Sequence, residues 1–245
     1  MGDVFETFIW PVRSYECAPD GCVTVANICN YLQEAASVNA EHLGFSKSNF
    51  DADNMNQTWV LTRMKIAIAR RPKWGENVHV LTFPRAGRRI VAYRDFVMTD
   101  DAGTELVRAT TEWMMIDMTS RRPVPIPEFV FERANTERAP VFGEAAFTTR
   151  LRWAAEAAVE SAYSVTAAPS DIDLNGHVNN VRYVTWLFDA RGGDQACSSI
   201  ELVFRSETMA GDEVFCETTT TPEGLLMQRL RSSSGEEHVL ALVSK

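Results

Sequence analysis

The order of predicted elements occurs twice in this chain, and this repeat constrains the fold more than any other sequence feature. Each half reads as a strand, then a helix, then four strands with period-two alternation. The turn at 74–76 has a counterpart at 210–212, and the turn at 102–104 has one at 234–236. An amphipathic helix is best buried by a curved sheet wrapped around it. The repeat therefore predicts an α+β fold with two long helices, each wrapped by a curved antiparallel sheet.

The first half is read most clearly from its helix. Apolar side chains recur at helical spacing from Val25 to Leu43, and Gly44 provides a natural stop. A polar connection without an element of its own is expected at 46–57. The stretch 121–147 is rich in proline and charge, which is typical of a linker. We therefore expect an N-terminal unit at 1–120, a linker at 121–147 and a C-terminal unit at 148–245.

A polar cluster, DIDLNGHVNN at 171–180, precedes the second helix, which the pattern places from His177 onward. Asp173, Asn175 and His177 are spaced two apart where a loop becomes a helix, and a helix start offers unpaired backbone N–H groups. Such a set can orient a water molecule and stabilise an oxyanion. Any one of these residues alone is better explained as a helix cap or a first-turn residue, whereas three within one turn favour a site.

The two halves are not chemically equivalent. Matching Tyr31 to Tyr183 sets Gly21, Val23 and Val25 opposite the three polar residues of the second half. The first half then lacks the cluster, and its apolar helix and sheet are expected to bind an apolar ligand. Each candidate is equally well explained as core. The candidates are Ile28, Leu32, Met64, Ile66 and Ile68, with Trp113 and Met115 as further possibilities.

Composition excludes several classes of function. The formal net charge of −9 argues against a broad nucleic-acid-binding surface. Five cysteines, an odd number without a C-x-x-C pair or nearby histidines, do not suggest a zinc site. We expect reduced thiols in a cytoplasmic protein, with no metal or organic cofactor. No apolar run approaches the length that spans a membrane.

Four segments resemble the acyl-ACP thioesterases of plant plastids and their bacterial relatives, which are double hot-dog proteins. In the first half these are WVLTRMKIAIARRPKWGENVHVLTF from Trp59 and YRDFVMTDDAGTELVRATTEWMMIDMTSRRPVPIP from Tyr93. In the second half they are DIDLNGHVNNVRYVTWLFD and ELVFRSE. The resemblance implies a tandem hot-dog that hydrolyses fatty acyl-acyl carrier protein, releases the free fatty acid and ends chain elongation.

The resemblance also implies site residues in the second half: Asp173, Asn175 and His177 of the D-x-N-x-H motif, and Glu207 from the following strand. Taken alone, Glu207 reads as a solvated strand residue. Thr208 stands where the plant enzymes usually have a cysteine, which argues against a Cys–His mechanism. We expect Asn175 and the backbone N–H groups of 176–178 to hold the oxyanion. Asp173 or Glu207 would activate water or attack directly, with His177 orienting a carboxylate.

The expected partner is an acyl carrier protein, which is strongly acidic, so docking on this acidic chain requires a local basic patch. Coenzyme A esters would also bind arginine through their phosphates. The alternatives left open are an acyl-CoA thioesterase, a hot-dog enoyl-thioester hydratase and a non-catalytic acyl-binding protein, as either a monomer or a homodimer. The docking candidates are Arg70, Arg71, Lys73, Arg85, Arg88 and Arg89, with Arg121 and Arg122 opening the linker.

Overall fold

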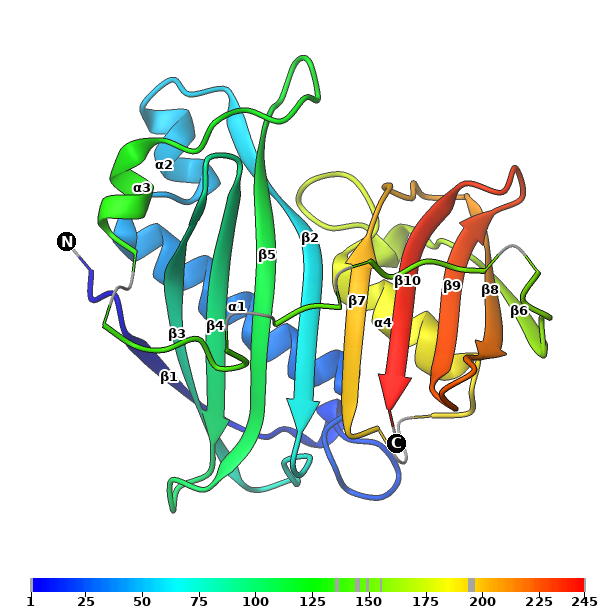
Figure 1. Cartoon of the computed structure of the whole chain (residues 1–245). Coiled ribbons are helices and arrows are strands. Elements are labelled where there is room, and N and C mark those ends of the chain that lie inside the picture. The colour runs from blue at the N-terminus through cyan, green and yellow to red at the C-terminus, as the bar shows by residue number, and fades with distance from the viewer. Residues whose placement is uncertain are drawn as a thin grey trace.

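One antiparallel sheet of ten strands runs through the whole molecule, and the helices pack on one of its faces (Figure 1). The structure is a computed structural model that describes residues 2–134, 137–143, 146–148, 150–154, 156–193 and 197–244. The strand order is β1-β3-β4-β5-β2-β7-β10-β9-β8-β6. Each half therefore supplies five neighbouring strands, and the predicted α+β architecture is confirmed.

The strands follow the predicted order in both halves. The first half contributes β1 (Glu6–Pro11), β2 (Gln57–Ile68), β3 (Asn77–Arg88), β4 (Val91–Thr99) and β5 (Glu105–Asp117). The second contributes β6 (Ser161–Thr166), β7 (Ser199–Phe204), β8 (Glu213–Thr220), β9 (Leu226–Ser232) and β10 (Glu237–Ser244). The two halves join where β2 pairs with β7, from Arg63 opposite Val203 to Ala67 opposite Ser199.

The first long helix, α1 (Val25–Leu43), has the predicted bounds. It begins where the Thr24 side chain accepts a hydrogen bond from the Asn27 N–H at 3.1 Å. It ends at Gly44, whose φ of +78° is a left-handed conformation that glycine adopts without strain.

The second helix, α4 (Asn180–Asp189), is only ten residues long and starts three residues later than predicted. The predicted start at His177 is wrong because the Val178 N–H donates across the fold to the Thr208 carbonyl oxygen at 2.9 Å. The first helical turn then forms after Asn179, whose side chain accepts a hydrogen bond from the Val181 N–H. The polar cluster consequently lies in the preceding loop, outside the helix.

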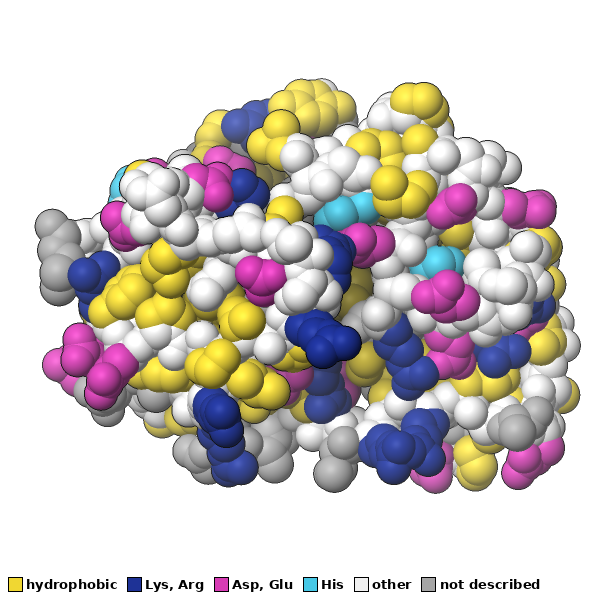
Figure 2. All heavy atoms as spheres, turned by 90° about the horizontal axis from the view of Figure 1, so that it is seen from above, with side chains coloured by type: hydrophobic (Ala, Val, Ile, Leu, Met, Phe, Trp, Pro, Cys, Tyr) yellow, Lys and Arg dark blue, Asp and Glu magenta, His cyan; other side chains and the backbone are white. Residues whose placement is uncertain are grey.

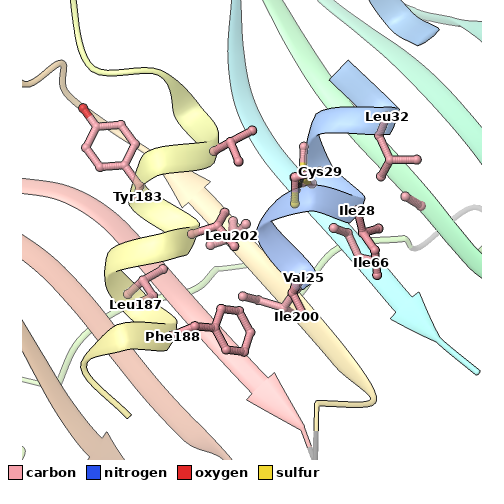
Figure 3. Packing of buried hydrophobic residues seen from close by; sticks show 14 of the residues in the cluster. Val25, Ile28, Cys29, Leu32, Ile66, Tyr183, Leu187, Phe188, Ile200 and Leu202 are labelled. Atoms are coloured by element: carbon pink, nitrogen blue, oxygen red, sulfur yellow. Dashed lines mark hydrogen bonds between the residues drawn. The ribbon is translucent and has the colours of Figure 1, made fainter. Parts of the chain in front are cut away.

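A continuous apolar core joins the halves, because α1 and α4 lie side by side over β2 and β7 (Figure 3). Ile28 and Ile66 from the first half and Leu187 and Ile200 from the second are fully buried within it. The helices turn apolar side chains toward one another across the seam between the halves (Figure 3). The two predicted wrapped helices thus share one core.

Two shorter helices and an outer strap complete the chain. Residues 46–57, expected to be irregular, contain α2 (Lys47–Ala52), which Ser46 caps by accepting from the Asn49 N–H. The predicted linker 121–147 contains α3 (Glu128–Glu132), and its residues 135–136 and 144–145 lie outside the described part of the chain. After α3 the chain crosses the outer face of the sheet, where the Lys65 ammonium donates to the Ala146 carbonyl oxygen at 2.7 Å (Figure 1). No helix within the described residues is both long enough and apolar enough to cross a membrane.

Candidate active site

Two loops with the same hydrogen bonds precede the two helices. In the loop before α1, the Gly21 N–H donates to the Ala18 carbonyl oxygen at 2.9 Å; in the loop before α4, the Gly176 N–H donates to the Asp173 carbonyl oxygen at 3.0 Å. Both glycines adopt left-handed backbone angles, with φ of +77° and +83°. Isolated β-bridges close both loops, between residues 17 and 23 and between residues 172 and 178.

These shared bonds correct the predicted alignment of the halves by three residues. Ala18, Asp20 and Cys22, rather than Gly21, Val23 and Val25, stand opposite the polar residues at 173, 175 and 177. Pairing the two tyrosines fails because the helices start at different distances from them. The corrected alignment leaves the chemical difference between the halves intact, since the first loop still lacks a histidine.

The loops lie at opposite ends of the sheet. The first loop contacts the connection from β2 to β3, where the Val23 N–H donates to the Pro72 carbonyl oxygen, and the second contacts the connection from β7 to β8 at Thr208. Because β2 and β7 are antiparallel neighbours, the ends of these strands point in opposite directions. Figure 2 shows the end above α4, where acidic, basic and histidine side chains gather around a hollow in the middle of the face.

The structure brings His177 and Glu207 together. The His177 Nε2 lies 3.6 Å from the Glu207 Oε1, just beyond direct hydrogen-bonding distance, so a water beside the pair can contact both atoms. The side chain of His177 is 23% exposed and that of Glu207 is 41% exposed. The pair is therefore open to solvent and to a substrate that approaches this end of the sheet.

Asp173 and Asn175 form the second part of the cluster. The Asn175 backbone N–H donates to the Asp173 Oδ1 at 2.8 Å, and the Asn175 Nδ2 lies 3.4 Å from the Oδ2. Both carboxylates act on a third group: the pKa of the Tyr183 hydroxyl is raised chiefly by burial, and the negative charges of Glu207 and Asp173 raise it further. The two predicted carboxylates therefore both lie close enough to the buried Tyr183 hydroxyl to act on it electrostatically.

Glu207 is not on a strand, as the sequence suggested, because β7 ends at Phe204. It lies in the connection to β8, and its carboxylate also accepts a hydrogen bond from the Arg121 guanidinium. Arg121 had been considered only as a possible docking residue. Arg121 opens the linker and is far from Glu207 in the sequence, so their contact in the fold could not be predicted from the sequence.

Two of the three backbone N–H groups assigned to the oxyanion are already engaged. The N–H of Gly176 donates to the Asp173 carbonyl oxygen, and that of Val178 donates to the Thr208 carbonyl oxygen. The expected use of Gly176 and Val178 as oxyanion donors is therefore wrong. The side-chain amide of Asn175, which donates to the Asp173 Oδ2 at 3.4 Å, and the imidazole of His177 are the side-chain donors of this loop.

An apolar pocket lies in the seam between the halves, a few residues from this loop. It is lined by α1 and β2 on one side and by the first two turns of α4 on the other. Its free volume is about 20 Å³, enough for roughly one water molecule. The pocket is thus a narrow slot, and an acyl chain would enter it only by moving side chains apart. The lining residues are Cys29, Leu32, Gln33, Ala36, Leu61, Met64, Phe96, Thr111, Trp113, Asn180, Val181, Val184 and Phe204.

The pocket includes only some of the candidates for apolar binding. Leu32, Met64 and Trp113 line the pocket. The other candidates are buried in the core and do not line it: Ile28 and Ile66 are fully buried, and Ile68 is buried as well. Met115 packs in a separate cluster near α2. The prediction placed the binding region in the first half alone. The apolar pocket itself lies at the seam, where Val181 and Val184 complete its wall, and acyl binding by the first half stays a prediction.

The predicted basic residues do not form one patch. Arg70, Arg71 and Lys73 precede β3, whereas Arg88 is the last residue of β3 and Arg89 follows it. The two ends of an extended strand of this length are about 36 Å apart, so the two groups lie at opposite ends of β3. Arg70 pairs with Glu76 and Asp100, Arg71 with Asp20, and Arg85 with the fully buried Asp95. Several of these charges are thus already compensated.

The exposed group at the site's end of the sheet is Arg88, Arg89, Arg121 and Arg122, which we call the rim arginines. The Arg89 carbonyl oxygen accepts a hydrogen bond from the Ile126 N–H, and this bond ties the hairpin that carries Arg88 and Arg89 to the segment that begins at Arg121. Arg121 in turn contacts Glu207. Positive charge therefore extends from the first half to the predicted site.

Comparison with known proteins matches both halves of the chain to one family. Residues 2–133 match the acyl-ACP thioesterase N-terminal domain and residues 154–244 match the acyl-ACP thioesterase C-terminal domain. An oleoyl-acyl carrier protein thioesterase from Arabidopsis thaliana is 30% identical over 86% of this chain and 63% of its own length. A palmitoyl-acyl carrier protein thioesterase from Gossypium hirsutum is 32% identical over 73% of this chain and 45% of its own length. Both are chloroplastic, and the chain spans less than two thirds of either relative.

Solved structures share the fold over the whole chain. A 12:0-ACP thioesterase from Umbellularia californica superposes with a TM-score of 0.87 at 23% identity, covering 100% of this chain and 98% of that one. An acyl-ACP thioesterase from Bacteroides thetaiotaomicron gives a TM-score of 0.83 at 22% identity, covering 98% and 97%. These likenesses confirm the tandem hot-dog prediction.

Proposed function

The chain belongs to the acyl-ACP thioesterase family, and from that premise we propose that it hydrolyses the thioester of a fatty acyl chain carried on acyl carrier protein. The products are a free fatty acid and the carrier thiol, and the release ends elongation of the chain. The observation that carries this proposal is the meeting of His177 and Glu207 beside a loop that leads into an apolar pocket. The chemistry belongs to the second half, 148–245, and the first half, 1–120, supplies most of the acyl-binding wall.

We assign activation of water to Glu207 and His177. A water beside the imidazole Nε2 and the carboxylate Oε1 can hydrogen-bond to both, because these two atoms lie 3.6 Å apart. As the water oxygen attacks the thioester carbonyl carbon, its proton passes to this pair. The alternative, direct attack by a carboxylate through a short-lived anhydride, uses the same residues.

The oxyanion and the leaving group complete the mechanism. The Asn175 side-chain amide is the donor for the carbonyl oxygen as it becomes negative, and Asp173 fixes Asn175 by accepting from its backbone N–H. The carbon–sulfur bond then breaks, and the proton held by the Glu207–His177 pair passes to sulfur. A thiol has a pKa of roughly 8.5, so the thiolate leaves with little acid assistance.

We propose that the acidic carrier docks on the rim arginines. These side chains surround the end of the molecule at which the thioester must enter, whereas Arg70, Arg71 and Lys73 lie at the far end of β3. Leu174 and Met209 are exposed on the same end and can add apolar contact. A coenzyme A ester could use the same arginines through its phosphates.

Steady-state hydrolysis of one acyl group presented on acyl carrier protein and on coenzyme A tests the proposal. Release of free thiol together with fatty acid is expected, with a higher kcat/KM for the carrier protein. A strong preference for coenzyme A would replace the proposed carrier. Consumption of an enoyl ester without thiol release would indicate the hydratase, and binding without turnover would indicate an acyl-binding protein. The cytoplasmic location expected from the sequence stays a prediction.

A further inference from the structure

Glu207 is held at the site by its neighbours in the chain more than by its own side chain. The side chain is 41% exposed, and its two partners, Arg121 and His177, are also partly exposed, so these ion pairs fix it weakly. The next residue, Thr208, is fully buried, and its carbonyl oxygen accepts the hydrogen bond from the Val178 N–H. The backbone on this side of Glu207 is therefore anchored to the second loop.

The residue before Glu207, Ser206, is anchored to β10, which is the strand next to β7 (Figure 1). The Ser206 Oγ lies 2.8 Å from the Nδ1 of His238 and donates to the Glu237 carbonyl oxygen at 3.2 Å. The Arg205 N–H donates to the His238 carbonyl oxygen at 2.8 Å. These three hydrogen bonds tie the chain immediately before Glu207 to the first two residues of β10.

His238 stands at a β-bulge. The pairing of β10 with β9 shifts by one residue between Glu237 and Val239, which leaves His238 as the extra residue of β10. A bulge re-aims a side chain relative to the regular pleat, and here the imidazole meets Ser206. His238 is only 4% exposed, so it is enclosed in the protein and does not touch a substrate. Any part that it plays in turnover must therefore act through another residue.

The hydrogen bonds of Ser206 assign the tautomer of His238. A serine hydroxyl has one proton, and the Glu237 carbonyl oxygen can only accept, so this proton goes to the carbonyl oxygen. The Ser206 Oγ then accepts from the His238 Nδ1–H. The other ring nitrogen, Nε2, is buried and has no hydrogen-bond partner among the described residues, so an N–H there would be left unsatisfied. The tautomer with the proton on Nδ1 is the one that leaves no N–H unpaired.

We propose that Ser206 and His238 are positioning residues, which hold Glu207 beside His177 by anchoring the backbone. This inference rests on the proposed function, since it assumes that Glu207 activates water. With Ser206 and Thr208 both anchored, the backbone between them has little freedom to move. Loss of the bond between Ser206 and His238 frees one side alone. The displacement of Glu207 should then be smaller than the shift of about 1 Å that costs on the order of 100-fold in rate.

Removal of the Ser206 hydroxyl tests this clamp. For Ser206→Ala we expect kcat for an acyl-carrier ester to fall about fivefold to thirtyfold. KM should stay within about twofold of wild type, because Ser206 belongs neither to the apolar pocket nor to the rim arginines. Wild-type kcat in Ser206→Ala, or a change confined to KM, would overturn the proposal.

Thr220→Val is the matched control. The Thr220 hydroxyl donates to the Glu160 Oε2 at 3.1 Å and ties the end of β8 to the residue before β6. Thr220 lies at the opposite end of the sheet from Ser206, because the register places it level with the start of β7. Thr220→Val should therefore keep wild-type kcat, and a fall equal to that of Ser206→Ala would assign both effects to a general loosening of the fold.

Substitution of His238 separates positioning from packing. His238→Asn places an amide nitrogen where Nδ1 stands and can keep the bond to Ser206, whereas His238→Leu fills the space without a donor. A residue that only packs would be replaced better by leucine. Positioning instead predicts that His238→Asn keeps kcat within about threefold of wild type and that His238→Leu falls about as far as Ser206→Ala. A higher kcat in His238→Leu than in His238→Asn would contradict the clamp, and Ser206→Ala decides if neither His238 variant folds.

A double-mutant cycle shows whether the clamp acts through Glu207. In the Glu207→Gln background, Ser206→Ala should cost less than about twofold in kcat, because the carboxylate that it positions is already absent. The same loss in both backgrounds would overturn the proposal.

The outcomes also separate the clamp from the proposed function. No release of thiol from any acyl-carrier ester by the wild type, or full turnover in Glu207→Gln, would refute the function assigned to the site. Loss of turnover in Glu207→Gln together with wild-type kcat in Ser206→Ala would refute the clamp alone.

Discussion

Replacing Gly176 by alanine tests whether the turn of the second loop shapes the site. Gly176 has φ of +83°, in the left-handed region where a side chain carries a penalty of about 1–2 kcal/mol. A Cβ added there meets no atom within 4 Å, so the penalty comes from the backbone alone. For a chain of this size the loss corresponds to a fall in Tm of about 2–8 °C.

The first loop offers a matched control. Gly21 has φ of +77°, its added Cβ also meets no atom within 4 Å, and its N–H makes the same turn bond to Ala18 that Gly176 makes to Asp173. Gly21→Ala should therefore lower Tm by a similar amount. It lies at the opposite end of the sheet, away from His177 and Glu207.

The two variants should differ in turnover. A backbone shift at Gly176 moves the neighbouring Asn175 and His177, and a displacement of about 1 Å at a catalytic group costs on the order of 100-fold in rate. We expect kcat of Gly176→Ala to fall by about that factor and kcat of Gly21→Ala to stay within about twofold of wild type. Thermal unfolding followed by circular dichroism, and thiol release from an acyl-carrier ester, measure the two quantities. Equal turnover in both variants would show that the turn at Gly176 does not shape the site.

Three further outcomes follow from charges and burial. Arg89→Glu should raise KM for an acyl-carrier ester about threefold to tenfold at low salt and Lys73→Glu should not, whereas equal effects would contradict docking on the rim arginines. Burial raises the pKa of Cys216 to about 12, so iodoacetamide should modify the partly exposed Cys17, Cys22 and Cys197 first and leave Cys216 unlabelled, with turnover retained. Loss of all activity on labelling of Cys216 would reopen a cysteine mechanism. The Arg231 hydrogen bond lowers the pKa of Glu217 below its ordinary 4.5, so this pair stabilises the fold at neutral pH and loses that contribution as the pH falls. The gap in Tm between wild type and Glu217→Gln should therefore be widest near neutral pH and close below pH about 4, and a gap independent of pH would contradict this.

The sequence predicted the elements best where local signals agree. Val25 to Leu43 was found correctly because a Thr24 cap, helical apolar spacing and Gly44 all indicate the same helix. Strand β7 was also placed correctly by its alternation. The start of α4 was missed because Asn175 and Gly176 suit a helix start locally, while the deciding bond, from Val178 to Thr208, joins residues 30 positions apart.

The site was predictable in its residues but not in its surroundings. The spacing of the motif and the resemblance together indicated His177 and Glu207, which the fold brings to 3.6 Å. Arg121 beside Glu207 depends on the course of the linker, and the pocket depends on how α1 packs against α4; neither leaves a local signal. The separation of Arg70 from Arg89 could have been inferred, because these two arginines flank opposite ends of one predicted strand.

Hydrolysis is proposed to depend on two carboxylates, Glu207 of the β7–β8 connection, which activates water, and Asp173 of the second loop, which fixes Asn175. The most direct measurement is kcat for thiol release by Glu207→Gln and Asp173→Asn, with Glu105→Gln as a control, because Glu105 also forms an exposed ion pair with an arginine. We expect both site variants to lose about 10²- to 10⁴-fold in kcat at unchanged Tm, while the control keeps wild-type turnover. Full turnover in Glu207→Gln or in Asp173→Asn would contradict it.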